Sequence, residues 1–426
     1  MSDLSTQSYK GTRDFYPEDM RLQRHIFDVW SRVCERYGYE EIMAPLLELS
    51  DLYRAKTGDE IVSEQTYSFT DRGGRDVTIR PEMTPSVARM VAARQQELGY
   101  PLRWYSIPNL WRYERPQHGR LREHWQLNVD VFGIHDIGAE VEIITLAHAL
   151  MREFGAEEDM FVIKLNSRRL MSFIFGDYLS LQVDSAHRLG KLLDRKAKIS
   201  DESFINQADA ILGDKLDKFL ELIKSTRLRD LPEEVRASSA ATELTKLAQT
   251  LHGRSINNIQ FDLTIQRGFD YYTGIVFEIF DTNEENARSL FGGGRYDDLL
   301  QIFKAPRVPA VGFGLGDVTF VDFLQTHSLT PKLSSRTQAM IASIGEDQNG
   351  ATEALAQQMR SEGVSVVVDV TARKIGSKIK LADKRDVPFV VIVGPDEVES
   401  GKYQLKELAS GDEFTGEASE LIARLS

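Results

Sequence analysis

Polar side chains of fixed geometry recur at every second position in the stretch from Trp111 to Gly133. Gln126 and Asp130 alternate with apolar residues there, so we expect them to share one face of a strand. Arg112 and Glu114 alternate in the same way near the other end. Arginine suits planar, bidentate recognition of carboxylate or phosphate. The spacing predicts an antiparallel hairpin with one apolar face and one anion-binding face, although an ordinary surface hairpin would alternate similarly.

The centre of this hairpin is a polar loop with several cations and little acid. Its basic residues are Arg115, His118, Arg120 and Arg122. Such a local excess of positive charge favours an anionic partner.

Further candidate site residues lie outside the hairpin. Glu82 directly precedes a helix predicted from Ser86 to Leu98, where a carboxylate is either a helix cap or a ligand group. Arg267 adds a cation, and Tyr271 and Tyr272 add amphipathic walls. No Ser-His-Asp or Cys-His arrangement is evident, so a side-chain nucleophile is not the leading idea. Arginines facing carboxylates favour phosphoryl or nucleotidyl transfer, in which positioning and charge stabilisation carry the catalysis.

The composition limits the class of protein. At 426 residues the chain should form two or three domains. The net charge of −13 argues against non-specific coating of nucleic acid but leaves local basic patches open. The one cysteine, Cys34, excludes an internal disulfide and a cysteine-rich zinc site; we expect a packed core thiol. No stretch suits a membrane span or a signal peptide, so a cytoplasmic protein without membrane contact is expected.

The elements that must position these residues are read from apolar spacing. A helix is predicted from Glu18 to Tyr37, then a strand from Glu40 to Leu47. Pro45 lies inside that strand and cannot donate to a ladder, so it marks an edge or a bulge. The edge is either a simple edge strand or a subunit boundary. The pattern becomes helical and highly charged from about 167 to 251, which indicates an inserted helical subdomain.

Strands are predicted to return at Ile259 to Ile265 and Ile275 to Phe280. Two glycine runs follow, at 292–294 and 312–316. Glycines permit close approach to a ligand or simple tight turns, and neither run fits a Walker loop or a dinucleotide fingerprint. The runs alone are therefore a weak functional signal.

A linker is predicted from Thr326 to Ser335, followed by alternating strands and helices. That order predicts a small α/β domain with a parallel sheet. One of its helices, predicted from Ala372 to Lys384, is rich in basic residues, among them Arg373, Lys374 and Lys378. The run is either an ordinary solvated face or a patch that contacts phosphates.

These residues resemble a known family. Trp111 to Gly133 resembles motif 2 of class II aminoacyl-tRNA synthetases. Arg267 to Gly274 resembles the histidine-specific motif of histidyl-tRNA synthetases, and Arg80 to Thr84 resembles the Arg-Pro-Glu-x-Thr segment of that family. The resemblance covers nearly the whole chain and is closest to a bacterial and plastid variant. It implies activation of L-histidine with ATP to histidyl-adenylate and transfer of histidine to the 3′ end of tRNA(His).

The resemblance also implies residue roles. Arg112 and Arg267 would be catalytic cations at the α-phosphate of ATP, where the histidine carboxylate attacks. The residues implied to bind histidine are Glu82, Met83, Thr84, Arg112, Gln126, Asp130, Arg267, Tyr271 and Tyr272. Those implied to bind ATP are Arg112, Glu114, Arg120, Arg122, His124 and Arg295. The tRNA acceptor end would meet Arg115, Gln117 and His118, and the anticodon a patch of Arg373, Lys374 and Lys378.

Cofactors and partners follow from the same resemblance. Magnesium is expected to accompany ATP, because the pyrophosphate charge needs neutralising, and neither an organic cofactor nor a resident metal is expected. The motif 1 resemblance of the N-terminal helix and the Pro45 strand implies a homodimer.

One departure from the family pattern concerns motif 3. That motif ordinarily ends in Glu-Arg, and its arginine grips the γ-phosphate. Here the stretch from Leu315 to Thr319 reads Leu-Gly-Asp-Val-Thr. Arg295 and Arg307 are possible substitutes, and we expect Arg295 because it follows the glycine run.

The expected fold is α/β. A catalytic domain in two parts, 1–166 and 256–328, would hold a mixed, mainly antiparallel sheet, interrupted by a helical insertion at 167–255. An α/β anticodon-binding domain would span 336–426. Two alternatives stay open: a non-catalytic regulatory subunit of ATP phosphoribosyltransferase with the same fold, and a synthetase for another amino acid.

Overall fold

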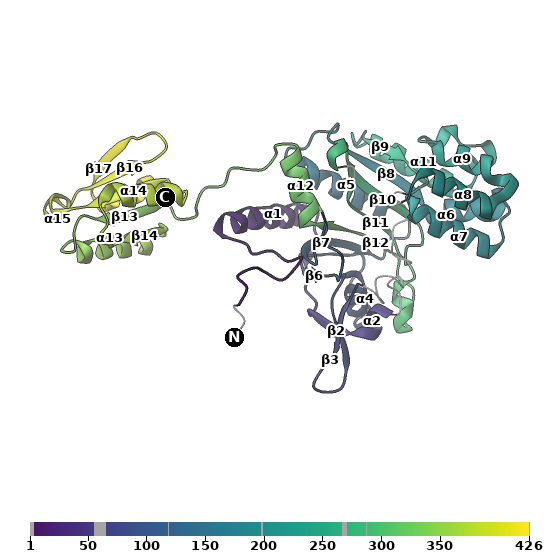
Figure 1. The fold of residues 1–426 in the computed structure, drawn as a ribbon, viewed down its shortest axis with the longest axis horizontal. Helices are drawn as coiled ribbons and strands as arrows, with labels where there is room; N and C mark the ends of the chain where they lie inside the picture. The colour runs from purple at the N-terminus through teal and green to yellow at the C-terminus, as the bar shows by residue number, and fades with distance from the viewer. Residues whose placement is uncertain are drawn as a thin grey trace. The chain divides into compact units, whose positions relative to one another are not determined.

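The computed structural model describes residues 4–54, 65–117, 119–196, 199–265, 271–286 and 288–425. The chain divides into two compact units, with the boundary between Thr330 and Pro331. Figure 1 shows the helices and strands of both units. Each unit has its own hydrophobic core. The first unit contains the hairpin and the glycine runs.

A large mixed sheet forms the centre of the first unit. Its strand order is β1-β5-β7-β12-β11-β10-β8-β9, with β6 paired to β7. β1 with β5 and β8 with β9 are parallel, and the remaining pairs are antiparallel. The mixed, mainly antiparallel sheet is therefore confirmed. The strands are β1 (Glu40–Glu41), β5 (Leu102–Ser106), β6 (Asn109–Trp111), β7 (Glu123–Phe132), β8 (Phe161–Ser167), β9 (Ile259–Phe261), β10 (Ile275–Asp281), β11 (Ser289–Arg295) and β12 (Ala310–Gly316).

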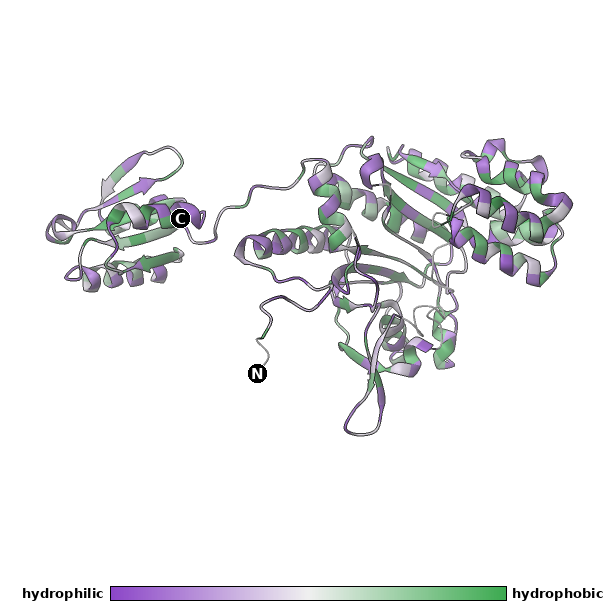
Figure 2. Cartoon of the chain, viewed as in Figure 1, coloured by the Kyte–Doolittle hydropathy of each residue, from purple (hydrophilic) through white to green (hydrophobic). Residues whose placement is uncertain are grey.

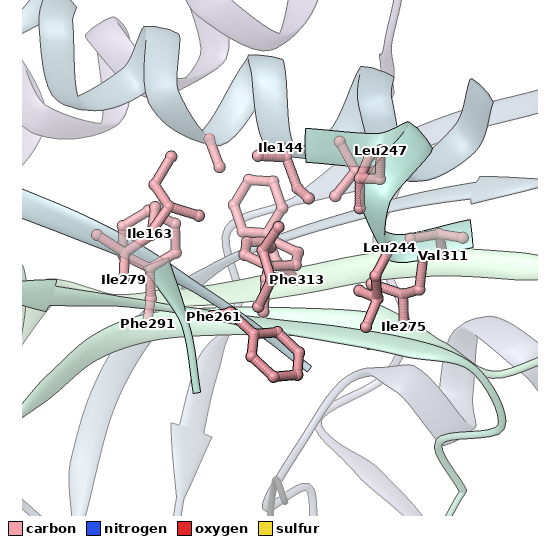
Figure 3. Packing of buried hydrophobic residues seen from close by; sticks show 14 of the residues in the cluster. Ile144, Ile163, Leu244, Leu247, Phe261, Ile275, Ile279, Phe291, Val311 and Phe313 are labelled. Atoms are coloured by element: carbon pink, nitrogen blue, oxygen red, sulfur yellow. The ribbon is translucent and has the colours of Figure 1, made fainter. Parts of the chain in front are cut away.

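The two faces of this sheet bury different clusters. Successive residues of a strand face opposite ways, so Val131 and Phe277 lie in one cluster while Phe132 and Val276 lie in the other. Figure 3 shows the first cluster, in which Ile144 from a helix approaches strand residues such as Phe313. The helices that build this side are α1 (Pro17–Arg36), α5 (Gly138–Glu153), α11 (Ser239–His252) and α12 (Asp317–Thr326). The other side is covered by α4 (Thr84–Ala93) and the 3-10 helix η6 (Leu299–Phe303).

Helix α1 confirms the predicted N-terminal helix. Its buried residues include Ile26, Val29, Trp30 and Val33, which fall on one stripe at helical spacing. Cys34 is fully buried on the same stripe, as expected for a packed thiol. Burial raises the pKa of this thiol, so the group stays protonated at neutral pH.

The prediction of one strand from Glu40 to Leu47 is wrong. The structure has β1 and, separately, β2 (Leu47–Leu49), because Pro45 interrupts the ladder between them. The Nη1 atom of Arg80 donates to the Ala44 carbonyl at 2.6 Å and satisfies the interrupted backbone. β2 joins a small antiparallel sheet of order β2-β4-β3. The other strands of this sheet are β3 (Tyr67–Thr70) and β4 (Asp76–Ile79), and the short helix α2 (Ser50–Arg54) follows β2.

The stretch predicted to be a helical insertion is a series of helices. Figure 2 shows both hydrophilic and hydrophobic residues along its helices, and the hydrophobic ones join the main core. Its helices before α11 are α6 (Arg168–Phe173), η1 (Ile174–Tyr178), α7 (Val183–Asp194), α8 (Asp201–Leu212), η3 (Gly213–Lys215), α9 (Leu216–Lys224), η4 (Leu228–Asp230) and α10 (Glu233–Arg236). A further short helix, η5 (Glu284–Asn286), precedes β11.

The second unit is a five-stranded sheet of order β14-β13-β15-β16-β17. The predicted parallel pairing is confirmed for β13 with β14 and β15, whereas β16 and β17 add antiparallel pairs that the predicted alternation lacks. The strands are β13 (Ala339–Ser343), β14 (Val366–Asp369), β15 (Phe389–Val393), β16 (Tyr403–Glu407) and β17 (Glu413–Gly416). The helices are α13 (Asn349–Ser361), α14 (Ile375–Lys384), α15 (Pro395–Ser400) and α16 (Ala418–Leu425).

Candidate active site

A small pocket lies on the central sheet, over β7 and β12. The pocket gathers residues from several separate parts of the first unit, most of them polar. Its lining residues are Glu82, Thr84, Arg112, Gln126, Asn128, Asp130, Tyr271, Tyr272, Tyr296, Gly312, Phe313 and Gly314.

Strand β7 supplies the floor through its period of two. Leu127, Val129 and Val131 are at most 1% exposed and lie in the main core. The intervening residues, including Gln126 and Asp130, point into the pocket. The two-faced hairpin strand is confirmed.

The glycines of β12 make room for these side chains. Gly312 is opposite Asp130 in the ladder, and a Cβ at Gly312 would lie 2.2 Å from Oδ1 of Asp130. A Cβ at Gly314 would lie 2.8 Å from Cδ of Gln126. Both runs of glycine lie within strands, β11 and β12, rather than in turns, and those of β12 leave space for the pocket side chains of Asp130 and Gln126.

Asp130 is a buried carboxyl group, 4% exposed. Burial raises its pKa to about 7, and a hydrogen bond from the Tyr296 hydroxyl works in the opposite direction. Tyr296 is absent from the expected site residues, although it also lines the pocket. In the sequence, the only signal for Tyr296 was its position directly after the glycine run. In the structure its backbone N–H donates to the Ala310 carbonyl, which turns the side chain toward β7.

Glu82 is a second carboxyl group in the lining of the pocket and is 3% exposed. The Tyr271 hydroxyl donates to Oε2 of Glu82 at 3.2 Å. Helix α4 begins at Thr84 with Met83 as its N-cap residue, so Glu82 is not the capping group. The side chain of Met83 is fully buried in the apolar cluster beneath and does not line the pocket, so the assignment of Met83 to histidine binding stays a prediction.

Arg112 lines the pocket and is oriented by the segment that precedes α4. Its Nε donates to the Pro81 carbonyl at 2.8 Å, one residue before Glu82. This contact ties the cation to the segment that carries the carboxylate.

The other hairpin arginines lie farther along the loop. Arg122 donates to the Glu114 carbonyl and to the Tyr9 hydroxyl, and its guanidinium stacks 4.2 Å above the Tyr113 ring. Arg120 reaches Oε2 of Glu114 at 3.4 Å and is half exposed. Neither arginine lines the pocket of Asp130.

His124 is held in its neutral form. Burial, together with the nearby guanidinium groups of Arg112 and Arg13, lowers its pKa to about 3. A neutral imidazole presents a flat, uncharged surface between two cations. That surface suits an aromatic base beside a phosphate group.

The expectation for Arg295 is wrong. Its side chain is 4% exposed and makes a two-pronged ion pair with Glu140, with Nε to Oε1 at 2.6 Å and Nη2 to Oε2 at 2.5 Å. The remaining guanidinium donors reach Asp297 and the carbonyls of Ile134 and Asp136. A guanidinium with this many protein acceptors holds the core together and is not available to a phosphate.

Two expected residues, Arg267 and His118, lie outside the described residues. The neighbouring loop residues Arg115 and Gln117 are exposed, and Gln117 forms a bridge with Arg120. Of the basic loop, Arg115 and Arg120 thus face solvent, whereas Arg122 is buried.

The basic patch of the second unit is only partly as expected. Arg373 and Lys374 are exposed at the start of α14. Lys378 is fully buried, however, and its Nζ donates to the carbonyls of Ser343 and Asp369 at 2.9 and 2.8 Å. Placing Lys378 in a surface patch is therefore wrong, because one turn of helix carries it from the solvent side to the sheet.

The fold and the pocket are those of class II aminoacyl-tRNA synthetases. The model of a family described as histidyl-tRNA synthetase matches residues 11–317, and one described as an anticodon binding domain matches residues 338–426. The histidine–tRNA ligase of Leptospira biflexa is 43% identical, over 99% of this chain and 98% of its own. That of Thermoplasma volcanium is 34% identical, over 96% of each chain. The crystal structure of histidyl-tRNA synthetase from Nostoc sp. PCC 7120 shares the fold, with a TM-score of 0.84, 21% identity and 99% coverage of both chains.

The chain belongs to the histidyl-tRNA synthetase family. The 43% identical histidine–tRNA ligase matches over both units, so the regulatory alternative is not favoured.

Proposed function

We propose that this protein is a histidine–tRNA ligase, which forms histidyl-adenylate from L-histidine and ATP and then esterifies tRNA(His). The observation that carries the proposal is a pocket lined by two buried carboxyl groups, Glu82 and Asp130, each bound by a tyrosine hydroxyl. Histidine has an imidazole and an ammonium group that require such partners at a fixed separation.

Different polar groups of the pocket bind the imidazole and the ammonium group of histidine. Asp130 accepts the N–H of the imidazole, and Tyr272 faces the ring from the same end of the pocket. Glu82, Thr84 and Gln126 hold the ammonium group. One ring nitrogen that donates and one that accepts define a single tautomer, which excludes side chains without both groups.

Activation joins the carboxylate of histidine to the α-phosphorus of ATP. The oxygen–phosphorus bond to the new adenylate forms as the bond to pyrophosphate breaks. Arg112 lies at the pocket and neutralises charge on the α-phosphate, with Arg267 as the second cation. Glu114, Arg120 and Arg122 orient the nucleotide, and His124 stacks on adenine.

Magnesium enters this proposal with ATP. It compensates the charge of the phosphates, and Glu114 offers the kind of oxygen ligand that the ion accepts beside phosphate oxygens. Glu114 lies half-buried on the hairpin, where Arg120 contacts its carboxylate. No step requires a metal site made of protein groups alone.

Transfer to tRNA uses two separate surfaces. The exposed loop residues Arg115 and Gln117, with His118, meet the acceptor end, and the exposed Arg373 and Lys374 meet the anticodon stem. These cations supply a local attraction for phosphates that the net charge of −13 does not cancel at short range.

We further propose a cytoplasmic homodimer. Apolar side chains around β2 and β3 are unusually exposed, including Met43 at 55%, Leu49 at 57% and Phe69 at 49%. An exposed apolar patch of this kind marks a protein interface. No helix in the described ranges is both long and apolar enough to cross a membrane.

A charging assay tests the proposed function. Purified protein, ATP, magnesium and a tRNA(His) transcript should attach labelled L-histidine to acid-precipitable RNA. A tRNA transcript of another amino acid specificity is the control and should remain uncharged. Absence of histidine attachment by correctly folded protein would refute the assignment.

A further inference from the structure

The start of α12 lacks the arginine that motif 3 ordinarily supplies. Asp317 begins the helix and is 2% exposed. The Thr319 hydroxyl donates to the Leu290 carbonyl at 2.8 Å, so this residue faces the neighbouring strand rather than a nucleotide. A cation for the end of ATP must therefore come from another part of the chain.

Asp317 instead holds an arginine from the N-terminal segment. Nη2 of Arg13 lies 2.6 Å from Oδ2 of Asp317, and the backbone N–H of Trp125 donates to Oδ1 at 3.0 Å. Nε2 of Gln23 also approaches Oδ2, at 3.4 Å. Asp317 thus fixes the guanidinium of Arg13 against the beginning of β7.

Arg13 retains a donor for a ligand. Its Nε is buried and has no hydrogen-bond partner among the residues that the structure describes. The guanidinium lies 4.8 Å above the Phe15 ring, which packs edge-on against Trp125 at 5.3 Å. The side chain nevertheless remains 27% exposed, so a phosphate can reach it. A buried, unpaired N–H is costly unless something binds it.

The location fits the far end of ATP. Along β7, Asp130 and Gln126 line the amino-acid pocket, and Trp125 contacts Asp317 at the next position toward the strand start. The Asp130 end is closed by buried Tyr296 and by β12. A nucleotide that meets Arg112 must therefore extend toward the start of β7, where Arg13 lies.

We propose that Arg13, held by Asp317, binds the β- and γ-phosphates of ATP and replaces the absent motif 3 arginine. This assignment rests on the proposed ligase activity. It gives Arg13 a direct role in substrate binding, and it gives Asp317 the role of positioning that cation.

The competing explanation is that Arg13 only neutralises the buried Asp317. Two variants separate the explanations, Arg13→Ala and the double variant Arg13→Ala/Asp317→Asn. The double variant removes the buried charge of Asp317 that Arg13→Ala leaves unpaired. If the effect of Arg13→Ala came only from destabilisation, the double variant would restore the wild-type KM for ATP. Arg24→Ala removes an exposed cation of α1 and is the matched control.

Steady-state histidine-dependent ATP–pyrophosphate exchange is the main measurement. In both Arg13 variants the KM for ATP and for pyrophosphate should rise about tenfold to a hundredfold, as expected for loss of a charge-assisted hydrogen bond. The KM for histidine and the inhibition constant of AMP, which has no β- or γ-phosphate, should stay near the wild-type values. Arg24→Ala should leave all four constants unchanged.

Recovery of the wild-type KM for ATP in the double variant would overturn the inference, as would an equal loss of AMP affinity. If the wild-type protein shows no exchange, the proposed function fails separately. Calorimetric binding of ATP and AMP to wild type and the double variant then decides the role of Arg13. Selective loss of ATP affinity supports it, and unchanged ATP affinity contradicts it.

Discussion

Asp130 shows how burial sets the chemistry of one residue in this protein. In water its carboxyl group would be ionised at neutral pH, but burial raises its pKa from 3.8 to about 7. An ionised Asp130 is the better acceptor for an imidazole N–H. The same ionisation disfavours the folded state when no ligand is bound, because the charge is buried.

The stability of the unliganded protein should therefore depend on pH through Asp130. A folded pKa above the unfolded pKa means that the folded state binds the extra proton, so stability falls as pH rises from about 4 to about 7. Relative to Asp130→Asn, the wild type should lose on the order of 4 kcal/mol over this window, from the shift of about three pKa units. Urea unfolding of both proteins at pH 4 and pH 8 measures the difference. A pH-independent difference would contradict the buried carboxyl account.

Tyr296 should act on histidine through Asp130. Removing its hydroxyl in Tyr296→Phe takes away the hydrogen bond that lowers the pKa of Asp130. We expect the KM for histidine to rise about tenfold and the pH profile of kcat/KM to move to higher pH. The KM for ATP should not change. Tyr403→Phe, in the second unit, is the control; a shift of the same size there would point to a non-specific effect.

At the residue scale, the sequence did not predict which hydrogen-bond and ion-pair partners the long charged side chains would have. Glu82, Gln126 and Asp130 were accessible from spacing and resemblance, because strand alternation and a short motif determine where they point. Arg295 and Lys378 have the charge expected of ligand-binding residues, but their long side chains reach buried carbonyls and carboxylates. Which acceptors they meet depends on contacts between distant segments, and no local pattern reports those contacts.

At the scale of elements, β7 and β12 act as a pair. The polar face of β7 is useful only if its neighbour has no side chains there, and the glycines of β12 meet that requirement. The sequence alone left these glycines as turns or backbone contacts, since the pairing of two strands far apart in the chain is not a local property.

Gly312→Ala should consequently damage the pocket. The new Cβ would lie 2.2 Å from Oδ1 of Asp130 and 2.6 Å from the Val129 carbonyl, so Asp130 or the strand must move. Histidine-dependent exchange should fall at least about tenfold, mainly through the KM for histidine. Gly190→Ala, in α7 where a Cβ meets open space, should preserve activity. Wild-type kinetics in Gly312→Ala would contradict the proposed fit.

Helix α14 and the residues just before it include two exposed cations with a proposed binding role and one buried lysine with a structural role. Arg373→Ala/Lys374→Ala should weaken tRNA binding and reduce its salt dependence by about one unit of slope per phosphate contact. Lys378→Ala should instead lower the unfolding free energy by about 3 kcal/mol, because buried carbonyls lose their donor. Filter binding at several salt concentrations and urea unfolding distinguish the two effects. An unchanged salt slope in the double variant would remove these residues from the tRNA surface.

At the scale of the whole molecule, fold class and the sequence of elements were the most predictable features. Long amphipathic helices such as α1 and buried strands such as β7 carry their periodicity in the chain itself. The antiparallel strands β16 and β17 escaped prediction because each is only four or five residues long, which is too short for alternation to be distinguished from an irregular segment. The break at Pro45 was indicated, but not its result of two strands in two different sheets.

The most direct test of the central claim is ATP–pyrophosphate exchange by the wild-type protein, measured with each amino acid separately. The pocket on β7 predicts that label from pyrophosphate enters ATP with L-histidine and not with the other amino acids, and that Asp130→Asn abolishes this exchange. Exchange with a different amino acid, or none with histidine, would contradict the account.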